Sequence, residues 1–231
     1  MVERSGCLVC GKRLVYSDRH APKKCVLCGE TFPGHAECSA GHFVCDRCHG
    51  LGAGDLIERY CIASEERDPL ALALYLMGSP AVMMHGPEHH FLVPAVLIAA
   101  YYNSLGEPAR KRAKLREARK RAANVLGGFC GFYGDCGAAV GTGIFVSVVT
   151  GATCLSKREW RLANLMTART LRTVALHGGP RCCKRNTFLA LREAAAFCRR
   201  ELRVKLAIGR KAKCAFSPMN RECLGKDCPF N

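Results

Sequence analysis

The chain has 231 residues, 17 of them cysteine, and a formal net charge of +16. This length can bury one good core plus a small appendage, and a hydrophobic content of 49% excludes a largely disordered chain. The longest apolar run, residues 91–102, is too short to cross a bilayer, so no membrane association is expected. Because no apolar leader follows Met1, we predict a cytoplasmic protein whose cysteines bind metal rather than form disulfides.

Residues 1–50 are predicted to form a zinc-ribbon-like metal-binding module. They hold three Cys-x-x-Cys pairs, a spacing that places two thiolates on one side of a tight turn. Cys38 with His42 or His35 completes eight ligands, enough for two closed zinc sites, and one zinc with spare thiols is the alternative. Closed sites stabilise a short segment, and this module is also the expected contact for a protein partner. The predicted ligands, whose pairing stays open, are Cys7, Cys10, Cys25, Cys28, Cys38, His42, Cys45 and Cys48.

The rest of the chain is predicted to be all-α, with a helical domain over residues 51–206 and a cysteine-containing tail over residues 207–231 that packs on it. The expected helices, in chain order, cover residues 55–63, 69–77, 91–102, 110–125, 156–177 and 184–205. Asp55 and Asp68 are expected to cap the first two, and Ser156 with Glu159 matches a capping box. The apolar stretch 138–149 is either one buried helix or two short elements.

Four polar groups gather before the helix expected at residues 91–102. His85, Glu88, His89 and His90 lie within six residues, and the helix dipole favours neutral imidazole at this position. Neutral imidazoles and carboxylates act as general bases or bind metal. We therefore predict these four as catalytic acid–base groups or a second metal site, with an ordinary solvated helix start as the alternative.

Two glycine-rich loops carry further cysteines. Cys130 and Cys136 lie in a loop where glycine lets the backbone approach a phosphate or an anionic iron–sulfur cluster closely. Cys182 and Cys183 follow a Gly-Gly-Pro turn, and the flanking cations are expected to lower the pKa of both thiols. Adjacent residues rarely bind one metal together, so we expect one of this pair to be a ligand and the other a neighbouring thiol.

The tail holds three more cysteines, and Cys228 precedes a proline, as cysteines that bind iron–sulfur clusters often do. A cluster held by Cys130, Cys136 and Cys182 or Cys183 would leave one iron open, whereas the tail cysteines would need Cys198, Cys61 or Cys154 to complete one. The predicted cofactor-binding residues are Cys130, Cys136, Cys182, Cys183, Cys214, Cys223 and Cys228.

Positive charge is concentrated in residues 106–231, which hold 26 Lys and Arg against eight Asp and Glu. Such a field favours an anionic partner or substrate, and we expect RNA, particularly tRNA, by analogy with the zinc ribbons of RNA-modifying proteins. The basic helix expected at residues 110–125 has no aromatic residues among its charges, so backbone binding is expected, and a solvated helix face is the alternative. The predicted nucleic-acid residues are Arg110, Lys111, Arg112, Arg116, Arg119, Lys120 and Arg121.

Four strings of the sequence, GHFVCDRCH, HGPEHHFLVPAVL, GGFCGFYGDCGAA and GGPRCCKR, resemble a cysteine-rich family of anaerobic archaea and bacteria catalogued as a domain of unknown function. The resemblance would extend over nearly the whole chain. Some relatives carry methyltransferase-like or radical-enzyme domains, which implies anaerobic metal chemistry but assigns no catalytic residue here.

Three functions are consistent with these patterns. The favoured one is an enzyme of anaerobic metal or sulfur chemistry, of sulfur-transfer or lyase type, which uses zinc and an iron–sulfur cluster on an anionic substrate. The alternative is a non-catalytic zinc-ribbon protein that binds RNA, with the helical cysteines merely buried. A metal chaperone or thiol-redox protein is the third.

Overall fold

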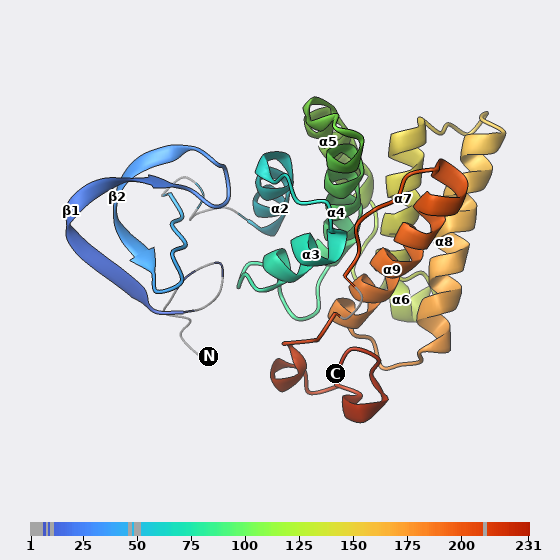
Figure 1. The fold of residues 1–231 in the computed structure, drawn as a ribbon. Helices are drawn as coiled ribbons and strands as arrows, with labels where there is room; N and C mark the ends of the chain where they lie inside the picture. The colour runs from blue at the N-terminus through green and yellow to red at the C-terminus, as the bar shows by residue number, and fades with distance from the viewer. Residues whose placement is uncertain (1–6, 8, 10–11, 46–47, 49–51, 210–211) are drawn as a thin grey trace.

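The computed structural model describes residues 7, 9, 12–45, 48, 52–209 and 212–231 (Figure 1). Its N-terminal part is an antiparallel hairpin of β1 (Leu14–Lys24) and β2 (Thr31–Cys38). The register pairs Leu14 with Cys38 at one end and Lys24 with Thr31 at the other, with an irregularity between Tyr16 and Ala21. The hairpin therefore separates the cysteines of its turn from Cys38 at the end of β2.

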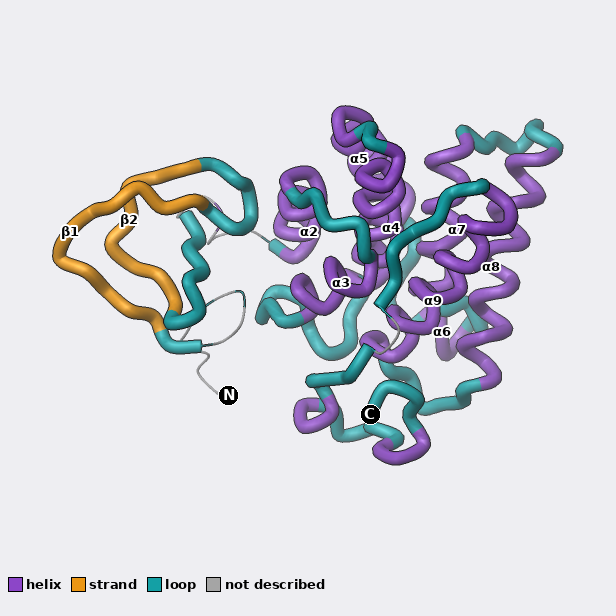
Figure 2. The backbone as a smooth tube through the Cα atoms, in the orientation of Figure 1, coloured by secondary structure: helices purple, strands orange, loops and turns teal. Residues whose placement is uncertain are grey.

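The remaining chain is mainly helical, as expected, and packs as a body to one side of the hairpin (Figures 1 and 2). Its helices are α2 (Ala53–Ala63), α3 (Pro69–Met77), α4 (Glu88–Leu105), α5 (Lys111–Ala122), α6 (Phe129–Phe132), α7 (Gly137–Thr150), α8 (Arg158–Leu176) and α9 (Cys183–Phe197). The centre of the body is α4, which packs against α2, α3, α5, α7 and α9. Its residues 92–100 are all buried, so the apolar run that is too short for a membrane is a core helix.

Several helix ends differ from the sequence-based expectations. Gly52 caps α2, and Asp55 lies in its first turn without capping it. The expected capping box of Ser156 is also wrong, because the Ser156 hydroxyl hydrogen-bonds to Thr153 and α8 begins only at Arg158. Asp68, in contrast, does cap α3, since its carboxylate accepts the Leu70 N–H at 2.8 Å.

Residues 137–150 resolve the open alternative, because they form the single helix α7. The last long helix is shorter than expected: α9 ends at Phe197, and residues 198–202 form a π-helical turn. The short helix α6, within the cysteine-containing glycine loop, was not predicted.

The tail folds back onto α9 and is held there by aromatic residues. Phe216 and Phe230 are buried, and the Phe230 ring lies 5.1 Å from the ring of Phe188. The Cys214 N–H donates to the Phe230 carbonyl at 2.6 Å, which closes the tail into a loop. The tail is thus fixed against the start of α9, where Cys182 and Cys183 lie. The division of the chain into domains at residues 50 and 206 stays a prediction.

Candidate metal centres and adjoining cleft

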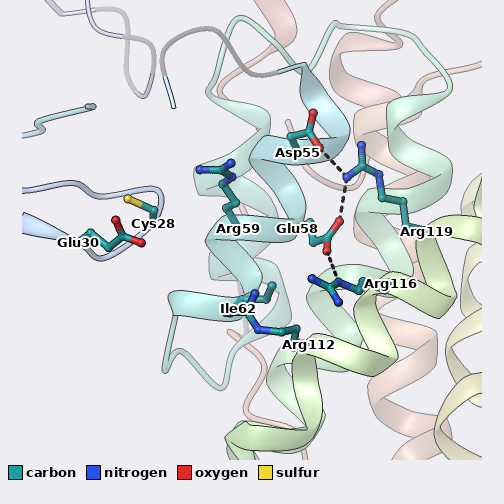
Figure 3. Close-up of a pocket in the computed structure, with 9 residues that line it drawn as sticks. All are labelled: Cys28, Glu30, Asp55, Glu58, Arg59, Ile62, Arg112, Arg116 and Arg119. Carbon is teal, nitrogen blue, oxygen red and sulfur yellow. Dashed lines mark hydrogen bonds and ion pairs between the residues drawn. The ribbon is translucent and has the colours of Figure 1, made fainter. Parts of the chain in front are cut away.

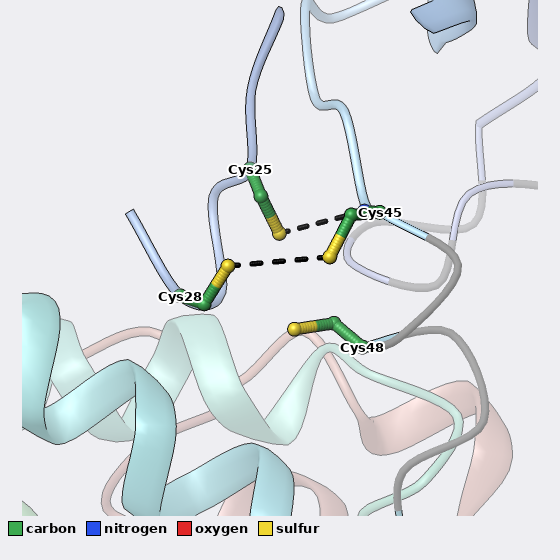
Figure 4. A group of neighbouring side chains, drawn as sticks. All are labelled: Cys25, Cys28, Cys45 and Cys48. Carbon is green, nitrogen blue, oxygen red and sulfur yellow. Dashed lines mark hydrogen bonds between the residues drawn. The ribbon is translucent and has the colours of Figure 1, made fainter. Parts of the chain in front are cut away.

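Four thiols of the N-terminal module converge in space (Figure 4). The sulfur atoms of Cys25, Cys28, Cys45 and Cys48 all lie within 4.8 Å of one another, and those of Cys28 and Cys45 are 4.0 Å apart. A tetrahedral zinc with bonds of about 2.3 Å to sulfur separates its ligands by about 3.8 Å. The spacing therefore suits a single metal ion.

The electrostatics of this group also favour a cation. Burial raises the pKa of Cys45 and Cys48, because a thiolate is costly away from water. Burial also raises the pKa of Cys25. Hydrogen bonds from backbone N–H groups, of which that of Cys45 has the largest effect, outweigh burial and bring the Cys25 pKa down to about 7. Four crowded thiols cannot all ionise without a counter-charge, and a bound divalent ion supplies one.

A second group joins Cys7, Cys38 and His42, whose ligand atoms also lie within 4.8 Å of one another. The His42 Nδ1 lies 3.3 Å from the Cys38 sulfur and 3.9 Å from that of Cys7. The histidine in the group is thus His42, whereas the ring of His35 lies 6.3 Å from that of Tyr16. Cys10, the fourth predicted ligand, lies outside the described residues.

The two groups favour one of the pairings that the sequence left open. Cys7 of the first Cys-x-x-Cys pair lies with Cys38 and His42, whereas the second and last pairs form the four-thiol group. The ligands therefore alternate between two sites along the chain. The sites lie at opposite ends of the hairpin, because Cys25 and Cys28 follow β1 at the turn and Cys38 ends β2.

A third set of cysteines lines an enclosed space between α9 and the tail, which we call the C-terminal cysteine pocket. Cys182, Cys214, Cys223 and Cys228 line a narrow space of about 10 Å³, about the room that one water molecule needs. Among the described residues, no three of these cysteines have all their sulfur atoms within 4.8 Å of one another. The four thiols thus share one cavity but are spaced too widely for one tetrahedral ion.

Hydrogen bonds converge on the sulfur atoms of this pocket. The Ser217 hydroxyl lies 3.4 Å from the Cys223 sulfur, and this bond lowers the pKa of Cys223. Burial raises the pKa of Cys182, although its sulfur accepts the Arg185 N–H at 3.4 Å and the Asn220 side-chain amide at 3.6 Å. Asn220 and Ser217 have no distinguishing sequence signal, and sequence reasoning missed both.

Two buried cations stand beside Cys182. Lys184 is 1% exposed, its ammonium donates to the Met77 and Val82 carbonyls, and burial lowers its pKa to about 8. Arg185 is 3% exposed, and its Nη2 donates to the Gly178 and Pro180 carbonyls. The Nη1 of Arg185 is buried and has no partner among the described residues. The start of α9 thus places two positive charges against the pocket.

Cys183 points away from this pocket. Its sulfur accepts the Gly86 N–H and lies close enough to Cys136 and Cys130 for their charges to raise its pKa. Burial, the largest cause, brings that pKa to about 11. The expected lowering of both thiol pKa values is therefore wrong, because burial of Cys182 and Cys183 outweighs the flanking cations.

Cys130 and Cys136 line a different and more open cavity of about 780 Å³, which we call the glycine-loop cleft. Its walls are the loop at residues 128–136, the C-terminal part of α8 and the turn at residues 178–181. The Cys136 sulfur accepts the side-chain amide of Asn186 at 3.5 Å. Cys182 does not line this cavity, so the structure does not bring it together with Cys130 and Cys136. The other member of the adjacent pair, Cys183, lies close enough to Cys130 and Cys136 for their charges to act on it, so a cluster on these three thiols stays a prediction.

The four predicted acid–base groups have separate surroundings. His89 is 1% exposed, and burial lowers its pKa to about 3. Its Nε2 donates a hydrogen bond to the Met83 carbonyl. In the neutral ring the other nitrogen, Nδ1, therefore accepts a hydrogen bond from the Thr187 hydroxyl. His90 Nδ1 donates to the Val125 carbonyl at 2.7 Å. These bonds give both rings a structural role, whereas their catalytic role stays a prediction.

His85 and Glu88 lie nearer to the cysteines. The Nε2 of His85 donates to Asn220, which itself donates to the Cys182 sulfur, so His85 reaches the C-terminal cysteine pocket through one residue. The Nδ1 of His85 and one carboxylate oxygen of Glu88 are buried without a hydrogen-bond partner among the described residues.

The remaining candidate cysteines line neither cavity. Cys61 and Cys198 are fully buried, and burial raises the pKa of each to about 12, which makes them inert core residues. Cys154 is exposed between α7 and α8. None of the three completes the set formed by the tail cysteines.

The basic helix α5 forms ion pairs with acidic residues of α2, and Figure 3 shows those of Arg116 and Arg119. Arg119 bonds to Asp55 at 2.7 Å and to Glu58 at 2.8 Å, and Arg116 lies 3.7 Å from Glu58. Intramolecular partners also hold three other predicted nucleic-acid residues, Arg110, Lys111 and Arg121. Arg112 and Lys120, which are exposed, have no ion pair among the described residues. The charge of this helix therefore mainly ties α5 to its neighbours.

These features define a cysteine-rich, mainly helical protein with Cys and Cys/His groups that can bind metal. Within the described part of the chain, no helix is long and apolar enough to cross a membrane. The chain belongs to the Family of unknown function (DUF5714), whose model matches residues 57–231. This confirms the resemblance to an uncharacterised family, but the match begins after the N-terminal module and so leaves out the GHFVCDRCH string. No curated protein and no solved structure matches the chain.

Proposed function

We propose that this protein is an iron–sulfur enzyme that acts on an anionic substrate, with structural zinc at both N-terminal sites and the cluster in the C-terminal cysteine pocket. The observation that carries the proposal is that four cysteines from two distant segments line one enclosed space. The start of α9 provides one of them and the tail provides the other three.

The spacing of these cysteines favours a cluster over a single ion. In a cluster each thiolate binds a different iron, so the sulfur ligands lie further apart than around one tetrahedral metal. The N-terminal groups have the close spacing, whereas among the described residues no three thiols of the C-terminal cysteine pocket lie within 4.8 Å of one another. The same protein therefore offers both arrangements, which supports zinc in the first and a cluster in the second.

The charge around the pocket supports the same assignment. A cluster bound by four thiolates is an anion, and the buried cations Lys184 and Arg185 would offset its charge. Hydrogen bonds from Ser217, Asn220 and the Arg185 backbone to the thiols are of the kind that tune a cluster's reduction potential.

This proposal changes the ligands that the sequence favoured. Cys182 is the member of the adjacent pair that would bind the cluster, and Cys183 is its neighbouring thiol. A cluster with four cysteine ligands has no open iron, so the anionic substrate would bind beside it. Sulfur transfer and lyase chemistry remain the proposed reaction types, and His85 is the predicted acid–base residue nearest to the pocket.

Metal analysis of protein prepared without oxygen tests the proposal. We expect about four iron, four sulfide and two zinc per chain. The protein should also show a broad absorbance at about 400 nm. Cys182→Ala and Cys223→Ala should each lose iron and sulfide but keep zinc. Cys154→Ala, which changes an exposed cysteine outside the cavities, is the matched control and should keep all three.

Wild-type protein that holds zinc without iron and sulfide would refute the cluster. Circular dichroism of each variant shows whether the helices persist, so that loss of iron is not confused with loss of the fold. Iron that survives both substitutions would place the cluster elsewhere.

A further inference from the structure

The glycine-loop cleft has the size and shape of a site for a small organic ligand. Its volume of about 780 Å³ falls within the range of ligand pockets, roughly 300–1,000 Å³. It lies between the glycine loop that carries Cys130 and Cys136 and the turn that precedes α9. It is separate from the N-terminal cysteine groups and shares only Arg185 with the lining of the C-terminal cysteine pocket.

The charges that line this cleft are all positive. Arg172, Arg181 and Arg185 contribute to its walls, and no acidic residue does so among the described residues. Arg172 and Arg181 are exposed, and no ion pair holds either of them in the described part of the chain. On α5, in contrast, Asp55 and Glu58 neutralise Arg119. The guanidinium groups of Arg172 and Arg181 are therefore available to a ligand.

Arg185 gives an independent indication of an anionic ligand. It is 3% exposed, its Nη2 is fixed by the carbonyls of the turn at residues 178–180, and its Nη1 lacks a partner among the described residues. A buried charged donor without an acceptor is costly, and an anion in either of the two cavities that Arg185 lines, this cleft or the C-terminal cysteine pocket, would provide the acceptor. Guanidinium groups also match the geometry of phosphate oxygens better than ammonium groups do.

The remaining wall is apolar and ends in an aromatic ring. Leu171 and Val174 of α8 line one side of the cleft. Phe132, which lines the rim, is 87% exposed and offers a free ring face. An exposed aromatic ring next to free arginines is suited to a planar base that carries a phosphate.

We propose that the glycine-loop cleft binds a nucleotide, with its phosphate on Arg172, Arg181 and Arg185 and its base against Phe132. This deepens the proposed function by naming the class of its anionic substrate. That the nucleotide is a substrate rests on the proposed function, but that the cleft binds a nucleotide does not. The binding itself requires the described walls of the cleft and no cluster.

Calorimetric titration of the anaerobically prepared full chain tests this site, with AMP, ribose 5-phosphate, inorganic phosphate and adenosine as probes. We expect AMP to bind most tightly and adenosine most weakly, because the phosphate meets three cations. Arg172→Gln and Arg181→Gln should each weaken AMP binding about tenfold or more, as the loss of a charge-assisted hydrogen bond implies. Phe132→Ala should weaken the binding of AMP but not that of phosphate.

Arg112→Gln is the matched control, because Arg112 is an exposed arginine on α5, away from the cleft. It should bind AMP as the wild type does. The proposal is overturned if AMP does not bind, if Arg172→Gln and Arg181→Gln bind AMP normally, or if Arg112→Gln weakens binding equally through net charge alone.

Iron content measured on the same samples separates the two proposals. AMP binding by protein that lacks iron would retain the cleft and remove the cluster. Protein with a full cluster and no AMP binding would do the opposite.

Discussion

The two cysteine-rich ends of this protein hold their thiols in different ways. In the N-terminal module, ligand atoms lie within 4.8 Å of one another in two groups, joined mainly by a single hairpin. At the C-terminal end, four cysteines surround a cavity against a helical body that has its own core. The difference leads us to expect that bound metal would organise the first region, whereas the helical core would organise the second without a cofactor.

The helical core gives this comparison its physical basis. Ile57, Phe145, Phe188 and most of α4 are fully buried, and burial of each large apolar side chain contributes about 1.5–3 kcal/mol. The N-terminal module buries chiefly its cysteines with Val9 and Leu27. The following predictions test this contrast.

The largest effect is expected from Cys25→Ser in the four-thiol group. Structural zinc contributes about 10–16 kcal/mol to small zinc-dependent folds, so loss of one ligand should unfold the hairpin while α2–α9 stay folded. Because the ligands alternate, the second site should also lose its metal. Zinc content reports the loss of metal, and proteolysis of residues 12–45 reports unfolding of the hairpin. A variant that keeps the second zinc would show that metal at the first site does not organise the whole N-terminal module.

Arg185→Met should destabilise the helical body by about 2–4 kcal/mol, because it leaves two carbonyls without their buried donor. Denaturant unfolding followed by circular dichroism gives this value. Arg181→Met is the control and should stay within about 0.5 kcal/mol of the wild type, since Arg181 is exposed. Equal stability of the two variants would show that the hydrogen bonds of Arg185 to the turn at residues 178–180 do not stabilise the helical body.

His89→Leu should flatten the acid dependence of helical stability. Burial lowers the His89 pKa from 6.5 to about 3, so between these values the unfolded chain binds the extra proton. The free energy of unfolding is therefore unaffected by protonation of His89 above about pH 6.5. It decreases as pH falls from about 6.5 toward 3, by up to about 1.4 kcal/mol per pH unit. Denaturation at a series of pH values measures this slope.

His177→Gln is the control for that measurement, because His177 is exposed at the end of α8. Acid also releases thiolate-bound metal, so the informative quantity is the difference between the slopes of the two variants. Identical slopes would show that His89 does not cause the acid dependence.

The smallest effect is expected at α5. Arg119→Ala should cost about 0.5–1 kcal/mol, because partly exposed ion pairs to Asp55 and Glu58 are screened by solvent. Arg112→Ala should be nearly neutral.

Electrophoretic mobility of tRNA across a salt series tests the RNA-binding alternative on the same helix. If Arg112→Ala and Lys120→Ala weaken binding and reduce its salt dependence, that alternative regains support.

Local patterns in the sequence predicted the helical body well. Asp68 caps α3, Gly106 ends α4 in the left-handed region, and α4 is buried as its composition predicts. These features depend on residues within a few positions of one another. The Cys-x-x-Cys spacing likewise predicted that Cys25 lies beside Cys28 and Cys45 beside Cys48, since a tight turn holds both thiols whatever the rest of the fold does.

The partners of the helical cysteines depend on tertiary packing and could not be predicted in this way. Cys182 and Cys183 are adjacent in sequence, yet they face different surroundings because they begin a helix. The tail folds back through Phe230 to reach Cys182, a contact that spans far more chain than any local pattern. Burial also reversed the expected effect of neighbouring cations on the pKa of both thiols.

Arg185 forms part of the wall of both the C-terminal cysteine pocket and the glycine-loop cleft. If both proposed ligands bind, one guanidinium serves two anions, and each must alter the affinity for the other by the same factor. An electron added to the cluster would then loosen the nucleotide, and a bound nucleotide would make the cluster harder to reduce. A single side chain would thereby link redox state to ligand release.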